Sequence, residues 1–100
     1  MAQQRYDVGD LVRVSAQFFN LDGEAANPTS VAAAVKTPSG VTTAVDSITQ
    51  DGLTYYFDLL LTEGSNTDPY WVRFEGTGAV TDASEQDLWV RPPNVVIPAP

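Results

Sequence analysis

Hydrophobic and polar residues alternate along most of this chain, and no segment shows convincing helical periodicity. The pattern is clearest in residues 11–19, where Val12, Val14, Ala16 and Phe18 share one face and Arg13, Ser15 and Gln17 share the other. Successive side chains of a β-strand point to opposite sides, so this spacing predicts a strand with one buried face. The same reasoning predicts a strand over residues 54–61, with Tyr55, Phe57, Leu59 and Leu61 inward and Asp58 in solvent.

Turn residues separate further segments of this kind. Short strands are predicted at residues 5–8, 31–37 and 41–45, and a hairpin is predicted from 70–78 and 87–91. Thr37-Pro38-Ser39-Gly40 fits a type I turn, and Gln50-Asp51-Gly52 predicts another. About seven strands with turn signals every 8 to 12 residues or so are typical of an all-β, immunoglobulin-like β-sandwich. A barrel of similar strand number is the alternative.

The hairpin carries both tryptophans of the chain. Tyr70, Val72 and Phe74 on one strand, and Leu88 and Val90 on the other, form its inward face. Tyr70 then either bonds upstream backbone through its hydroxyl, as in a tyrosine corner, or is simply a core aromatic.

The opposite face of the hairpin is the candidate protein interface. It presents Trp71, Arg73, Trp89 and Arg91, which are expected to cluster in either strand register. Tryptophan and arginine are enriched at interface hot spots, and arginine stacking on tryptophan adds about 0.5–1 kcal/mol at an exposed site. The alternative is that a bulge turns at least one tryptophan into the core.

Residues 92–100 contain four prolines, which prevent regular sheet pairing and favour an extended arm. We therefore divide the chain into a sandwich domain, residues 1–92, and a proline-rich C-terminal arm, residues 93–100. Val95, Val96 and Ile97 are the arm's candidate partner contacts. A frayed terminus is the alternative.

Composition restricts the chemistry. The chain has 100 residues, enough for one domain, and a net charge of −8, which disfavours binding to nucleic-acid phosphates. Cysteine and histidine are absent, which removes the usual transition-metal ligands and the Ser-His-Asp and Cys-His arrangements of nucleophilic catalysis. The carboxylates lack the spacing of a calcium loop, and a domain of this size has little room for a glycosidase cleft. No enzyme activity, metal or cofactor is predicted, and neither a membrane span nor a signal peptide is recognised.

Several segments resemble small immunoglobulin-like structural proteins of tailed bacteriophages and prophages. The similar residues are Tyr6 to Val14, the turn Asn27-Pro28-Thr29, Phe74 to Gly78, and Trp89-Val90-Arg91-Pro92. The resemblance covers the chain up to about Pro92, and it brings no catalytic residues.

This resemblance implies a non-enzymatic virion protein, assembled in the bacterial cytoplasm. The expected role is head decoration, which binds and stabilises the outer capsid lattice. The expected partners are the major capsid protein or another virion protein and further copies of the chain, a trimer being one expected form. A tail or head–tail connector component is one alternative. A carbohydrate-binding adhesion module, with Trp71, Trp89 and Tyr56 as sugar-stacking residues, is the other.

Overall fold

The computed structural model describes residues 5–95, 97 and 98, and these residues form eight strands and no helix. The strands are β1 (Arg5–Asp7), β2 (Leu11–Gln17), β3 (Ser30–Lys36), β4 (Thr42–Ala44), β5 (Thr49–Asp51), β6 (Thr54–Leu60), β7 (Tyr70–Thr77) and β8 (Asp82–Arg91). The prediction of an all-β chain is confirmed. The described part of the chain therefore contains no helix that could cross a membrane.

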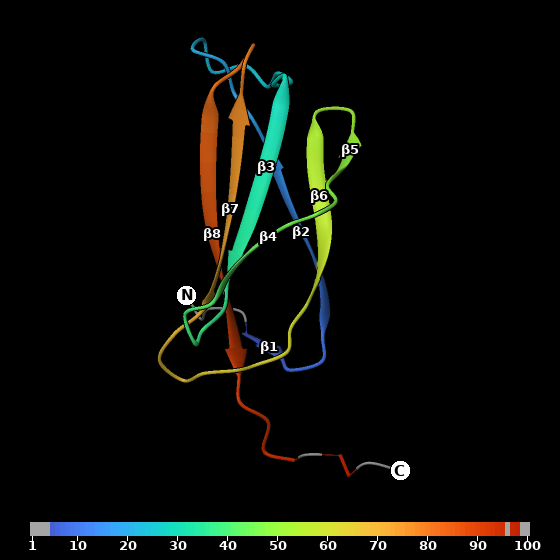
Figure 1. Ribbon diagram of the computed structural model, residues 1–100, viewed down its shortest axis with the longest axis vertical. Coiled ribbons are helices and arrows are strands. Elements are labelled where there is room, and N and C mark those ends of the chain that lie inside the picture. Colours follow the sequence, from blue (N-terminus) through green and yellow to red (C-terminus); the bar gives the residue numbers. More distant parts are fainter. Residues whose placement is uncertain (1–4, 96, 99–100) are drawn as a thin grey trace.

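The strands form two sheets, which Figure 1 shows as two facing layers. One sheet has five strands in the order β1-β8-β7-β3-β4, and the other has three in the order β2-β6-β5. All neighbours are antiparallel except β1 and β8, which pair in parallel. The barrel alternative is wrong, because no hydrogen-bonded ladder joins the two sheets within the described residues.

The core lies between the sheets and consists of the inward faces that the alternation predicted. Val14, Phe57 and Leu61 come from the three-stranded side, and Val72, Phe74, Leu88 and Val90 are among those from the five-stranded sheet; all of them are buried. The rings of Phe57 and Phe74 meet across the layers with centroids 5.5 Å apart. Burial of these side chains is the main source of stability, at roughly 1.5–3 kcal/mol for each fully buried large apolar side chain.

Tyr70 satisfies both interpretations of its role. The residue is only 1% exposed. Its hydroxyl oxygen accepts hydrogen bonds from the backbone N–H groups of Thr62 (2.9 Å) and Glu63 (3.1 Å). The first residue of β7 therefore fills the core and also holds the loop that leads into its own strand.

The prediction of about seven strands missed β5. The sequence indicated a turn at 50–52, whereas Gln50 and Asp51 belong to β5 and the turn lies at Gly52-Leu53. All three residues of β5 are exposed, and the strand is held only by pairing with β6. Because β5 has no buried side chain, the alternation of hydrophobic and polar residues does not indicate it.

At one end of the sandwich, the loop before β3 packs closely against β7. A Cβ atom on Gly76, which is buried, would lie 2.5 Å from Pro28 Cγ and 3.1 Å from Phe18 Cδ1. Gly78 follows with a φ of +95°, a backbone conformation that favours glycine. At the other end the chain leaves β8, and Pro92 to Val95 form no strand (Figure 1).

Candidate protein-contact surface

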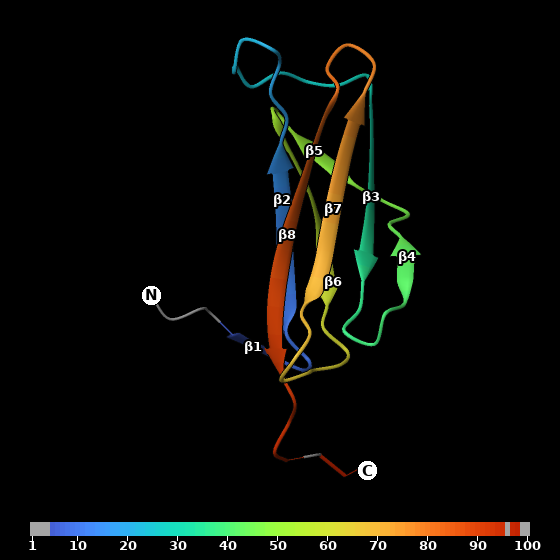
Figure 2. The same cartoon turned by 90° about the vertical axis from the view of Figure 1, so that its left-hand side faces the viewer.

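The outer face of the five-stranded sheet carries both tryptophans, and Figure 2 views the molecule from this side. Exposure alternates residue by residue along β7, where Trp71, Arg73 and Glu75 point away from the core. Glu85, Asp87, Trp89 and Arg91 are the corresponding outward residues of β8. We call this surface the tryptophan face. It also includes Arg5 and Asp7 of β1, Ala32, Ala34 and Lys36 of β3, and Thr42 and Ala44 of β4.

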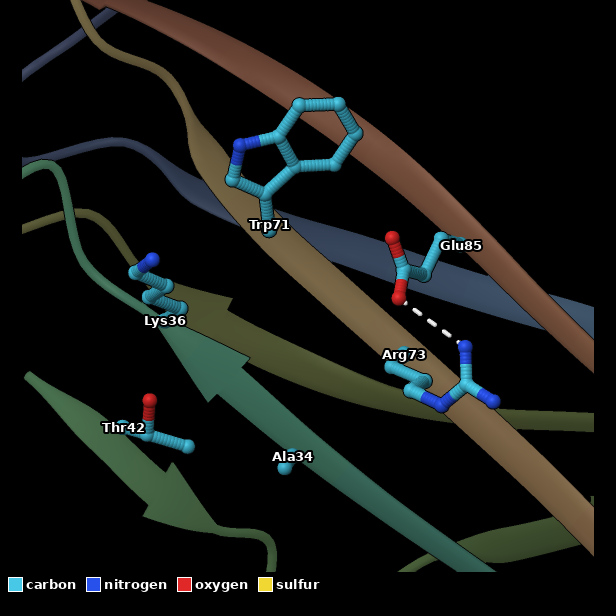
Figure 3. A pocket seen from close by; sticks show the side chains of 6 residues that line it. All are labelled: Ala34, Lys36, Thr42, Trp71, Arg73 and Glu85. Atoms are coloured by element: carbon cyan, nitrogen blue, oxygen red, sulfur yellow. Dashed lines mark hydrogen bonds and ion pairs between the residues drawn. The ribbon is translucent and has the colours of Figure 1, made fainter. Parts of the chain in front are cut away.

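Trp71 lies in a row of paired residues that crosses four strands. Its direct partners are Asp87 on β8 and Lys36 on β3, and Lys36 is paired in turn with Thr42 on β4. The indole of Trp71 is 41% exposed. It borders an open hollow of about 350 Å³, which Ala34, Lys36, Thr42, Arg73 and Glu85 also line (Figure 3). The hollow exists because Ala34 and Thr42 are small; a long side chain at either position would fill it.

Trp89 is the diagonal neighbour of Trp71, since Asp87 pairs with Trp71 and Trp89 lies two residues further along β8. Its indole N–H donates a hydrogen bond to Asp87 Oδ2 at 3.1 Å. On its other side β1 places Arg5 as its pairing partner. Trp89 is partly buried, but neither tryptophan belongs to the core between the sheets. The alternative that a tryptophan turns into the core is therefore wrong.

The two hairpin arginines are engaged in ion pairs. Arg73 Nε lies 2.7 Å from Glu75 Oε2 and its Nη1 lies 2.9 Å from Glu85 Oε2. These hydrogen bonds raise the pKa of the Arg73 guanidinium above its ordinary value. Arg91 pairs with Asp7, chiefly through a hydrogen bond that raises the pKa of Arg91 and lowers that of Asp7.

No arginine stacks on a tryptophan among the described residues, so the stabilisation that such a stack could add is not realised there. The cation–π contact that the structure does contain lies on the other sheet, where the Arg13 guanidinium carbon is 4.2 Å from the centroid of Tyr56. Arg13 also pairs with Asp58, its direct cross-strand partner, at 2.8 Å. Carboxylates opposite the hairpin arginines compete for them, and the competition favours the charged partner over the indole.

The four hairpin residues share one face but do not form one cluster. In the register Arg73 lies opposite Glu85 and Trp71 lies opposite Asp87, and Trp89 and Arg91 follow along β8 in further steps of two residues. Arg91 lies six residues along β8 from Glu85, the partner of Arg73, which is roughly 20 Å at the usual strand rise. The tryptophans therefore form the centre of the candidate surface, and Arg91 lies at its end.

The first arm residues border the end of the tryptophan face, where Val95 lines an open hollow with Asp7 and Arg91. Val95 is 79% exposed and Ile97 is 87% exposed. Val96, the third predicted contact, lies outside the described residues. No neighbouring element covers Val95 or Ile97, so both side chains are open to a partner.

The sugar-stacking set is divided between the two sheets. Tyr56 lies on the outer face of the three-stranded sheet, as the pairing partner of Ser15 and Thr49. Trp71 and Trp89 lie on the opposite side of the sandwich. One ligand cannot stack on all three rings, so this three-residue platform is wrong.

Lys36 and Arg5 are the members of the surface that sequence reasoning missed. The alternation of residues 31–37 already placed Lys36 outward, but its pairing with Trp71 depends on the register between β3 and β7. The pairing of Arg5 with Trp89 depends on the parallel contact of β1 with β8, which nothing in the local pattern indicates. Both basic residues are free of ion pairs among the described residues.

The tryptophan face combines aromatic, charged and small side chains. It offers two indole surfaces, two unpaired cations and a shallow open hollow rather than an enclosed cleft. No group of three or more acidic side chains in the described ranges is arranged to hold a metal ion. Comparison with known proteins adds no family: no family model, curated protein or solved structure matches this chain.

Proposed function

We propose that this chain is a non-enzymatic, immunoglobulin-like structural protein of a tailed bacteriophage or prophage particle, with head decoration as its role. The immunoglobulin-like assignment is supported by the strand order. In that fold strands B, E and D share one sheet, while C, F and G share the other, extended by C′ in variable-type domains. The orders β2-β6-β5 and β8-β7-β3-β4 correspond to this plan strand by strand.

Tyr70 supports the same assignment. It stands at the start of β7, the counterpart of strand F, and its hydroxyl bonds backbone upstream. The antibody hallmarks of a core tryptophan on strand C and a disulfide are missing, because β3 supplies Ala33 and Val35 and the chain has no cysteine. The proposal is therefore for the fold plan and not for an antibody-type domain.

The observation that carries the binding role is the half-exposed Trp71 at the centre of the outer sheet face. Leaving an indole 41% open to water gives up hydrophobic stabilisation that a core position would supply. A partner that covers it recovers this free energy as binding free energy, as buried tryptophans do at interface hot spots. The partner that covers this face is proposed to be a component of the particle: the major capsid protein, another virion protein or a further copy of this chain.

The C-terminal arm is the second proposed attachment element. Pro92 and Pro93 end β8, and the exposed Val95 and Ile97 follow. An extended arm loses little conformational entropy when it binds, because proline already restricts its backbone. Each chain would attach through both its arm and its domain, and many copies would attach across the lattice. Such multivalent attachment gives firm binding to the particle even when each single contact is weak.

Localisation on purified particles tests this function. Mass spectrometry of particles produced with the gene present and deleted should detect the chain only in the former, and cryo-EM difference density should lie on the capsid lattice. Density confined to the tail would reject decoration in favour of a tail or head–tail connector component. Absence of the chain from particles would reject both.

The hollow beside Trp71 favours one second candidate, a carbohydrate-binding adhesion module. An exposed indole next to Lys36, Thr42 and Glu85 provides a stacking surface and hydroxyl-bonding groups for one sugar ring. Binding of the isolated domain to a glycan array, abolished by Trp71→Ala and unaffected by Tyr56→Ala, would support this candidate. A blank array would remove it.

A further inference from the structure

Charge is distributed very unevenly over the molecule. The tryptophan face carries four of the five basic residues, Arg5, Lys36, Arg73 and Arg91, together with the acidic residues Asp7, Glu75, Glu85 and Asp87. Nine of the 13 acidic residues and one of the five basic residues therefore lie elsewhere. The face is neutral, whereas the rest of the chain carries the whole net charge of −8. Pairing two copies through their neutral faces avoids the repulsion that this net charge causes between the acidic parts of the surface.

The same face holds both a protrusion and a depression. Trp71 rises from β7 on the side of the hollow described above (Figure 3). Next to it, along the outer side of β3, a second depression of about 170 Å³ is lined by Ala32, Ala33, Ala34, Arg73 and Glu75. Outward alanines on β3 leave room that a large side chain from another molecule can enter.

We infer that two copies of this chain pair through their tryptophan faces, related by a two-fold axis. In a two-fold interface a residue that contacts a site on the partner finds its own site contacted in return. A face that contains both the protrusion and the depression satisfies this condition. Trp71 of each copy enters the alanine depression of the other, and charges of both signs are available to pair across the interface.

The size of the face fits a weak, specific dimer. The five strands lie about 4.8 Å apart and hold between three and ten residues each, so they cover roughly 500 Å² of sheet plane before side-chain relief is added. Standard specific interfaces bury about 800 Å² on each partner, and transient ones bury less. The pairing is therefore expected in the micromolar range or weaker, and it is independent of the proposed virion setting.

Sedimentation equilibrium of the full chain tests this pairing, with two variants of equal added charge. Ala32→Arg places a long side chain in the depression, at an exposed position opposite Glu75. Ser15→Arg makes the same change on the outer face of the other sheet, opposite Tyr56. Thermal unfolding of all three chains establishes that each is folded.

The wild type and Ser15→Arg are expected to dimerise equally, and Ala32→Arg is expected to weaken the dimer by about ten-fold or more. A wild type that stays monomeric at millimolar concentration overturns the inference. So does a dimer that survives Ala32→Arg unchanged. If a monomeric wild type binds particles and Ala32→Arg does not, the face serves a virion protein instead of a second copy.

Discussion

The hydroxyl of Tyr70 accepts a hydrogen bond from the backbone N–H of Thr62 at 2.9 Å, across the loop that precedes β7. Removing this acceptor leaves the N–H groups of Thr62 and Glu63 without their partner in a partly buried place. Tyr70→Phe is therefore expected to lower the free energy of unfolding by about 1–3 kcal/mol, measured by urea denaturation. Tyr56→Phe, on an outer face, is the matched control and should change stability little. Equal effects of the two substitutions would contradict this role.

Gly76 is required by the close approach of the loop before β3. Gly76→Ala would force Pro28 or Phe18 to move, since the added Cβ would lie 2.5 Å from Pro28 Cγ. We expect a loss of about 1–3 kcal/mol, as is usual for overpacking a core. Calorimetric melting can measure it, with the exposed neighbour substitution Thr77→Ala as control. If Gly76→Ala is as stable as the control, the loop that contains Pro28 moves without a measurable cost, and the close approach does not require glycine.

Asp58 gives the fold a defined pH dependence. The hydrogen bond from Arg13 lowers the pKa of the Asp58 carboxyl below its ordinary value. Folding therefore favours the charged carboxylate, and this contribution is complete above the unfolded pKa and disappears as pH falls through the folded one. Asp58→Asn should be less stable than the wild type at pH 7, and the gap should close under strongly acidic conditions.

Urea unfolding across this pH range measures the gap directly. Arg13 and Asp58 are both well exposed, so added salt should also reduce the stability difference between the wild type and Asp58→Asn at pH 7. A gap that stays constant down to low pH would assign the effect of Asp58→Asn to something other than the ion pair.

The arm is expected to contribute to attachment and not to folding. Val95 and Ile97 are almost fully exposed, so deletion of residues 93–100 removes no buried surface that the structure describes. The free energy of unfolding of the shortened chain should stay within about 0.5 kcal/mol of that of the full chain. Particle binding by the shortened chain should fall. Unchanged particle binding would end the role proposed for the arm.

The sequence predicted those parts of the fold that bury side chains with period two. The inward faces of β2, β6, β7 and β8 are found as the alternation indicated, because a slip of one residue would move each hydrophobic set into water. β5 escaped detection because it buries nothing. The parallel pairing of β1 with β8 was also unpredictable, since it joins opposite ends of the chain.

The candidate surface was predictable to a similar extent. The outward direction of Trp71, Arg73, Trp89 and Arg91 follows from alternation and is found in the structure. What each of them contacts depends on register: Arg73 faces Glu85, Trp71 faces Lys36, and Arg91 reaches Asp7. Alternation cannot provide register, so it could not show that Arg73 and Arg91 pair with carboxylates.

Intrinsic tryptophan fluorescence of the wild-type chain on dilution tests the central claim most directly, because both tryptophans lie on the proposed contact face and neither lies in the core. If this face pairs with a second copy, dilution from about 1 mM to about 1 µM uncovers the indoles without unfolding the chain. We predict an emission maximum that moves to longer wavelength across this range, while circular dichroism stays constant. An emission maximum that does not change with concentration would contradict the claim.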